Sequence, residues 1–130
     1  MTKVGDLYRS ADFKTEKHVP VIELPTTIKP GEFFEVTVSV GKEIPHPNTS
    51  AHFIAWIGLA YKADGEPTPY DLGRAEFGAH GSSVKGADSI VMHTNPFAKF
   101  LIKVDKPGEL IASSYCNIHG YWESGAKVTL

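Results

Sequence analysis

Side chains that can bind a transition metal lie in three short segments of this sequence. The candidate donors are Glu16, His18, His46, His52, Cys116 and His119, and Lys17 lies between the first two. Imidazole nitrogen, thiolate sulfur and carboxylate oxygen are all recognised protein ligands for metal ions. One ion could therefore collect ligands from all three segments if the fold brings them together.

In the C-terminal segment a cysteine and a histidine are separated by two residues. On an extended strand Cys116 and His119 would point to opposite faces, about 10 Å apart. Asn117 and Gly120 favour a tight turn instead, and in such a turn residues three apart can share a face. A thiolate and an imidazole could then reach one ion, and the backbone N–H groups of Ile118 and His119 could hydrogen-bond the sulfur. The spacing alone is common.

The second segment is stiffened by proline. Pro45 and Pro47 flank His46, restrict the residues before them to extended backbone and lack an N–H donor. A fully extended chain would separate His46 from His52 by roughly 20 Å. The turn-forming residues 48–50 can fold the loop back, so that both imidazoles converge.

At Glu16-Lys17-His18 an extended backbone places the carboxylate and the imidazole on one side and directs the ammonium group away. Each of these features also has an ordinary structural explanation, because lone cysteines are usually buried and histidines at strand ends are usually packed or solvated. The remaining histidines, His80 and His93, have neighbours typical of ordinary strand residues, and we leave them outside the candidate site.

Length, composition and charge favour one small domain spanning residues 1–130. The chain has 42% hydrophobic residues, 15 acidic and 13 basic residues, and a formal net charge of −2. No basic run would follow a phosphate backbone or an anionic membrane, so we expect no nucleic-acid or membrane partner. No apolar stretch approaches the ~20 residues of a membrane span, and the N-terminus lacks the order of a secretory signal. We therefore expect a cytoplasmic protein.

Cys116 is the only cysteine in the sequence. This excludes an intrachain disulfide and a metal cage built from several cysteines. Packing or a metal ion with mixed ligands must therefore stabilise the small core.

The elements that must position these side chains are predicted to be β-strands. Residues 32–40 alternate apolar and polar side chains, the period of a half-buried strand. Similar runs occupy 52–62, 70–79, 89–94, 98–104, 109–115 and 126–130, with 19–27 as an edge candidate interrupted by proline.

Turn-forming residues separate these runs, among them Lys29-Pro-Gly31, Ala63-Asp-Gly65 and Glu123-Ser-Gly125. Short strands at such intervals predict an all-β, immunoglobulin-like antiparallel sandwich or barrel of about seven strands. A short irregular N-terminal segment precedes it, in which residues 6–13 could form a helical turn.

The order Glu-x-His, His-x5-His and Cys-x2-His resembles the superoxide reductase family, in its one-iron neelaredoxin type. The flanking sequences are similar too: Glu16-Lys-His-Val-Pro20, Ile44-Pro-His-Pro-Asn48, His52-Phe-Ile-Ala-Trp-Ile57 and Ser114-Tyr-Cys-Asn-Ile-His-Gly-Tyr-Trp122. The similarity covers nearly the whole chain. Two-iron desulfoferrodoxin relatives carry an additional four-cysteine module, which a sequence with one cysteine does not contain.

The resemblance implies one mononuclear iron per chain and an oxidoreductase that reduces superoxide to hydrogen peroxide. In the implied ligand set His18, His46, His52 and His119 are equatorial, Cys116 is axial and Glu16 is a reversible sixth ligand. Lys17 would guide superoxide and organise a proton-donating water. The resemblance also implies a rubredoxin-like external electron donor, a homotetramer and a role in detoxification of superoxide.

Three other functions deserve comparison with this hypothesis. A blue-copper electron-transfer protein is also a β-sandwich with cysteine and histidine ligands. Its trigonal copper site uses two histidines and usually an axial methionine, whereas this sequence offers four candidate histidines and no methionine after Cys116. A superoxide dismutase would need no reductant, and the usual mononuclear iron dismutases have no thiolate ligand. An immunoglobulin-like binding module with incidental histidines would tolerate Cys116→Ser without a change in function.

Overall fold

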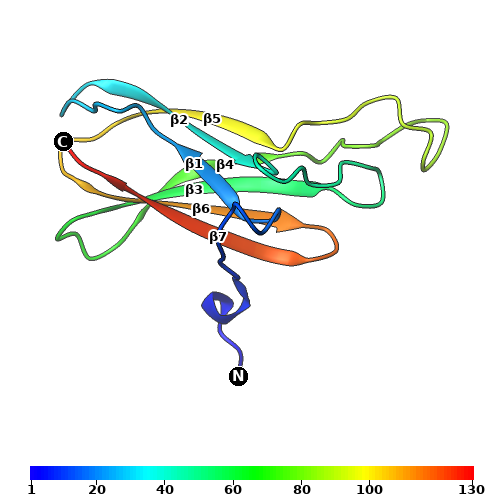
Figure 1. The fold of residues 1–130 in the computed structure, drawn as a ribbon, viewed down its shortest axis with the longest axis horizontal. Coiled ribbons are helices and arrows are strands. Elements are labelled where there is room, and N and C mark those ends of the chain that lie inside the picture. The colour runs from blue at the N-terminus through cyan, green and yellow to red at the C-terminus, as the bar shows by residue number, and fades with distance from the viewer.

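The computed structural model describes residues 1–130 as two antiparallel β-sheets packed face to face (Figure 1). The smaller sheet has the order β1-β2-β5, formed by β1 (Pro20–Glu23), β2 (Phe33–Val40) and β5 (Phe97–Lys103). The larger sheet has the order β4-β3-β6-β7, formed by β4 (Tyr70–Glu76), β3 (Ile54–Ala63), β6 (Gly108–Cys116) and β7 (Gly120–Val128). These seven strands confirm the predicted immunoglobulin-like sandwich.

Alternating side chains of the two sheets fill the space between them. In β2 every second residue is buried, and Val36 and Val38 have no exposed surface. Ile57 in β3 and Leu110 in β6 are equally buried on the facing sheet. Cys116 belongs to the same cluster of buried residues, so the candidate thiolate lies where the core reaches one end of the sandwich.

Two predicted strands differ from the structure. Residues 89–94 pair with no other strand and lie in the long loop between β4 and β5 (residues 77–96, called the β4–β5 loop below). The last strand begins at Gly120 rather than at residue 126, because Gly125 is not a turn residue but pairs with Ile111 inside the sheet. A side chain there would approach Glu109 Oε1 to 2.6 Å, so this glycine permits close packing.

The N-terminal segment also differs from the predicted helical turn at 6–13. A short 3₁₀ helix, η1 (Val4–Leu7), is followed by extended chain. The backbone of Arg9 accepts a hydrogen bond from Glu123 N (2.8 Å) and donates one to Tyr121 O (3.1 Å), so the edge of β7 satisfies groups that a helix would otherwise pair. Nothing helical in the structure has the length and apolar character needed to cross a membrane.

Three connections gather at one end of the sandwich, on the right of Figure 1: the β2–β3 loop (residues 41–53), the β4–β5 loop and the turn between β6 and β7. The seven candidate residues named from the sequence, six donors and Lys17, lie in or beside two of these connections or in the segment that enters β1.

Candidate metal centre

The β6–β7 turn brings the cysteine and histidine of the third segment together. Cys116 pairs with Gly120 at the end of the ladder, which leaves a three-residue turn over 117–119, and Gly120, which closes this turn, has a φ of +80°. The Cys116 sulfur lies 3.7 Å from Nδ1 of His119. The predicted tight turn is therefore confirmed. The predicted hydrogen bonds from the N–H groups of Ile118 and His119 to the sulfur are not formed, and the polar neighbour of the sulfur is the His119 imidazole.

The β2–β3 loop folds back as its turn-forming residues predict. Thr49 N donates to His52 O, and His52 N donates to Thr49 Oγ1, both at 3.0 Å. The ring centroids of His46 and His52 are consequently 4.7 Å apart. At the start of the loop Gly41 has a φ of +91°, and a β-carbon there would lie 2.6 Å from the backbone nitrogen of His46. Only glycine fits both the backbone conformation and the close approach.

Asn117 joins this loop to the β6–β7 turn. Its Oδ1 accepts from Phe53 N (2.9 Å), its Nδ2 donates to Ala51 O (2.8 Å), and its own N–H donates to Phe53 O (3.2 Å). The sequence identifies Asn117 only as a turn former. In the structure it fixes the residues on both sides of His52 against the turn that carries Cys116.

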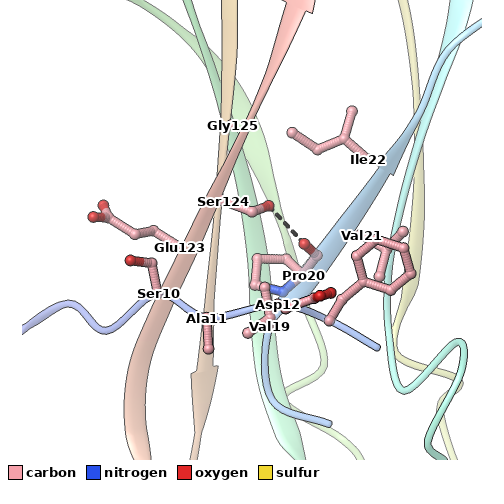
Figure 2. Close-up of a pocket in the computed structure, with 11 residues that line it drawn as sticks. Ser10, Ala11, Asp12, Val19, Pro20, Val21, Ile22, Glu123, Ser124 and Gly125 are labelled. Atoms are coloured by element: carbon pink, nitrogen blue, oxygen red, sulfur yellow. Dashed lines mark hydrogen bonds between the residues drawn. The ribbon is translucent and has the colours of Figure 1, made fainter. Parts of the chain in front are cut away.

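His18 is held where the N-terminal segment enters β1. Its ring stacks on Trp122 of β7, with centroids 5.2 Å apart and planes 15° apart. Two residues later, Pro20 O accepts a hydrogen bond from Ser124 Oγ (2.6 Å), the dashed line in Figure 2. A surface cavity of about 400 Å³ beside this bond lies outside the histidine cluster. The contacts with β7 thus fix both the backbone and the ring plane of His18.

The four candidate imidazoles form a closed quadrilateral. Adjacent ring centroids in the order His119, His18, His46, His52 and back are separated by 4.6, 4.9, 4.7 and 5.0 Å. The diagonal between His18 and His52 is longer, at 6.2 Å. Four rings arranged in this way can direct one nitrogen each toward a common point.

The nitrogen atoms inside the quadrilateral fit a metal ion better than they fit one another. His119 Nδ1 lies 3.0 Å from His18 Nε2 and 3.3 Å from His52 Nε2. One nitrogen of a neutral imidazole carries either one hydrogen or one lone pair, so it cannot form a good hydrogen bond to both neighbours. The donor atoms of His18, His52, Cys116 and His119 all lie within 4.8 Å of one another. Neighbouring nitrogen ligands ~2.1 Å from one ion would have about this spacing.

His46 adds a separate indication of an ion. Its Nδ1 lies 2.6 Å from the carbonyl oxygen of Pro47, which makes Nδ1 the protonated nitrogen. Its Nε2 is buried and has no hydrogen-bond partner. A buried lone pair of this kind is costly unless something accepts it, and a cation would.

Burial keeps these imidazoles in the form that binds metals. It lowers the pKa of His46 from 6.5 to about 4, and the positive charges of the neighbouring groups act in the same direction. Burial also lowers the pKa of His18, more than the Glu16 carboxylate raises it, and lowers that of His52. These rings are therefore neutral near pH 7, as ligands must be.

Glu16 and Lys17 lie beside the quadrilateral rather than inside it. Glu16 Oε1 lies 2.6 Å from Nδ1 of His18, on the side of the ring away from His119. Burial alone would raise the pKa of Glu16, but the hydrogen bonds from His18 lower it below its usual value. Lys17 is half-buried and forms no hydrogen bond or ion pair. Its charge contributes to the lowered pKa values of His18, His46 and His52.

Sequence reasoning missed two residues next to the centre. Trp122 supports His18, although the sequence analysis places it in no predicted strand and gives it no role. His80 was expected in a strand, but it lies in a turn of the β4–β5 loop, is 6% exposed and stacks on Phe53. The alternation of its neighbours gave no signal of this role. His93 is exposed in the same loop.

Comparisons with known proteins agree with this geometry. Residues 10–125 match the family described as desulfoferrodoxin. The chain is 50% identical to the superoxide reductase of Pyrococcus furiosus and 48% identical to the neelaredoxin of Megalodesulfovibrio gigas, covering 98% of each chain in both cases. The superoxide reductase (neelaredoxin) of Archaeoglobus fulgidus, solved in the reduced form, superposes with a TM-score of 0.87 at 53% identity, over 95% of this chain and 99% of that one.

Proposed function

This chain belongs to the desulfoferrodoxin family, and from that premise we propose that it is a superoxide reductase. The reaction is the one-electron reduction of superoxide, in which O₂⁻, one electron and two protons give hydrogen peroxide. The electron comes from an external donor. A blue-copper protein is not favoured, because the cluster holds four imidazoles whereas a trigonal copper site uses two.

The observation that carries this proposal is the convergence of imidazole nitrogens and a thiol sulfur at one point. Three of these nitrogens lie within 3.3 Å of a neighbour, and the sulfur lies 3.7 Å from the nearest of them. His18, His46, His52, His119 and Cys116 would hold iron. When bound, iron supplies the redox chemistry, giving one electron to superoxide in its ferrous state and regaining it from the donor.

The charge of the ligand set helps to select the substrate. Four neutral imidazoles and one thiolate around Fe²⁺ leave a local formal charge of +1. An anion such as superoxide is attracted to this charge, and a neutral competitor is not. The lowered pKa values of His18, His46 and His52 keep the imidazoles neutral and preserve this balance near pH 7.

Lys17 and Glu16 would act on the substrate and its protons. The Lys17 ammonium group has no carboxylate partner, so it is free to attract superoxide and to hold a water that donates a proton. Glu16 accepts a hydrogen bond from His18 Nδ1 and so directs Nε2 of that ring toward the cluster. Its further role as a reversible ligand requires the carboxylate to leave His18.

The test is iron analysis of anaerobically purified protein followed by titration with superoxide. We expect peroxide to form in proportion to the superoxide consumed when a reductant is present, with no oxygen released. Oxygen release without any reductant would indicate a dismutase. Protein that binds no iron after loading would refute the proposal.

Several finer proposals remain to be tested. Four rest on the family resemblance: one iron per chain, a rubredoxin-like donor, a homotetramer and a role in detoxification. A single domain over residues 1–130 and a cytoplasmic location rest on the length and composition of the sequence. Metal-to-protein stoichiometry, reduction by rubredoxin in stopped flow and light scattering would test the first three. An iron content of two per chain, for example, would contradict the first.

A further inference from the structure

The β4–β5 loop packs against the loop that carries two of the histidine ligands. Asn48 Nδ2 donates to Thr94 O (2.9 Å), and Ser50 Oγ hydrogen-bonds the Asp88 carboxylate. Gly81 has a φ of +70°, and a β-carbon there would lie 3.0 Å from Ser50 Cβ. This long loop contains no strand of either sheet. Its contacts with the β2–β3 loop therefore indicate what the loop does, because long loops in compact domains are commonly functional.

His80 lies at the middle of this contact, and both of its ring nitrogens are used. Thr94 N donates to Nδ1 (3.0 Å), which makes Nδ1 the unprotonated nitrogen. Nε2 therefore carries the proton and donates it to Thr49 O (3.1 Å). The ring also stacks on Phe53, with centroids 4.7 Å apart and planes 24° apart. The ring is therefore held in one orientation between two backbone groups.

The bond to Thr49 leads directly to a candidate ligand. Thr49 exchanges two hydrogen bonds with His52, one from its backbone N–H and one to its hydroxyl, both at 3.0 Å. Phe53, on which His80 stacks, follows His52 in the chain. His80 thus contacts the residues that orient His52 from two directions without touching the ion site.

We propose that His80 is a positioning residue of the metal centre, which holds the Thr49 carbonyl and thereby fixes the orientation of His52. This inference rests on the proposed function, because it takes His52 as a ligand. His80 is not itself a ligand, since neither ring nitrogen is free. Groups that orient metal ligands in this way commonly alter metal affinity by about 10–100-fold when they are removed.

Two substitutions separate the bond to Thr49 from the rest of the side chain. In His80→Gln the terminal amide reaches about as far as Nε2 and can still donate to the Thr49 carbonyl. In His80→Asn the shorter amide can accept from Thr94 N but cannot reach Thr49. His93→Gln is the matched control, because this exposed histidine lies in the same loop and contacts the edge of the His80 ring (centroids 5.5 Å apart) but has no bond to Thr49.

The measurements are the rate of iron release to a chelator, the ferric–thiolate absorption of the oxidised protein, and hydrogen exchange of the Thr49 and His52 amides without metal. In His80→Asn we expect iron release at least about 10-fold faster, a shifted band and faster exchange. His80→Gln should lie close to wild type in all three, and His93→Gln should match it.

The proposal is overturned if His80→Asn behaves as wild type, or if the Gln and Asn variants lose iron equally fast. Should His80→Asn not fold, the exchange rates in His80→Gln decide, because rates far above those of wild type would also refute it. Hydrogen exchange needs no iron, so it tests the contact even if wild type fails to bind iron and the proposed function is wrong.

Discussion

Two of the four imidazoles have their outer nitrogen occupied by an acceptor. His18 Nδ1 contacts the Glu16 carboxylate, and His46 Nδ1 contacts the Pro47 carbonyl, each at 2.6 Å. Each bond fixes a tautomer in which Nε2 presents its lone pair to the cluster. The chain therefore selects the ligating nitrogen of these rings before any metal binds.

The buried imidazole of His46 should make the stability of the metal-free protein depend on pH. Its pKa is lowered to about 4, whereas in the unfolded chain it is near 6.5. Between these values the unfolded state binds a proton that the folded state does not, so the free energy of unfolding falls as pH decreases from 6.5 to 4. The full loss would be about 3 kcal/mol, and above pH 6.5 this group contributes no pH dependence.

Urea denaturation of the metal-free protein at several pH values measures this effect. His46→Gln replaces the titrating ring, so its free energy of unfolding should change less over the same interval. A residual slope is expected from His18 and His52, whose pKa values are also lowered. Equal slopes in the variant and the wild type would show that His46 is not held neutral by burial.

Substitution of the only thiol tests the sulfur ligand directly. Cys116 has no exposed surface, and serine is close to it in size, so Cys116→Ser should fold. We expect the ferric–thiolate absorption to vanish and peroxide formation to fall by at least about 10-fold, because a hydroxyl is a much poorer donor than a thiolate. Ser113, half-buried in the same strand and without a side-chain hydrogen bond, offers Ser113→Ala as a control that should retain the band. Retention of the band in Cys116→Ser would exclude the thiolate ligand.

At the scale of elements, the loops that carry the ligands depend on glycines with positive φ. Gly41 and Gly65 have φ values of +91° and +78°, so alanine at either position should cost about 1–2 kcal/mol in backbone strain. Only at Gly41 would the new methyl group also collide, because His46 N lies 2.6 Å away, whereas nothing lies within 4 Å at Gly65.

This pair predicts different effects on metal binding. Gly41→Ala should displace His46 and speed iron release, in addition to destabilising the fold. Gly65→Ala, in the distant turn between β3 and β4, should lower the melting temperature while iron release stays as in wild type. Thermal unfolding and transfer of iron to a chelator measure the two properties separately. The prediction fails if both variants retain iron equally well.

Most strands could be predicted because their side chains alternate. The pattern in residues 32–40 has no competing explanation, and β2 occupies nearly the same residues. Residues 89–94 are rich in apolar side chains as well, but Val91 is 71% exposed and the segment has no pairing partner. A strand needs a neighbour, and local pattern does not reveal whether one exists. The prediction of a turn at Gly125 was wrong for a related reason. The sequence does not distinguish a glycine that permits close packing inside a sheet from one that forms a turn.

At the scale of the whole molecule, the candidate centre joins segments that are far apart in the sequence. The resemblance supplied the ligand positions, and the structure brings His18, His52, Cys116 and His119 within one cluster. It did not supply the roles of Trp122, Asn117 and His80, because each acts through a tertiary contact. These contacts are the stacking of Trp122 on His18, the hydrogen bond of Asn117 to Phe53 and the hydrogen bond of His80 to Thr49. Such contacts depend on register and loop path, which the spacing of residues does not specify.

A centre built from distant segments should also stabilise the fold when it binds its ion. The ligands come from the entry to β1, from the β2–β3 loop and from the β6–β7 turn, and unfolding would separate them. An ion that binds only the folded state adds about 3 kcal/mol of stability at a free concentration 100 times its dissociation constant. Anaerobic addition of Fe²⁺ to metal-free protein should therefore raise the melting temperature, and a chelator should reverse the change. In His52→Ala, which removes the half-buried ligand, the rise should be smaller. An equal rise in that variant would mean that the ion binds elsewhere.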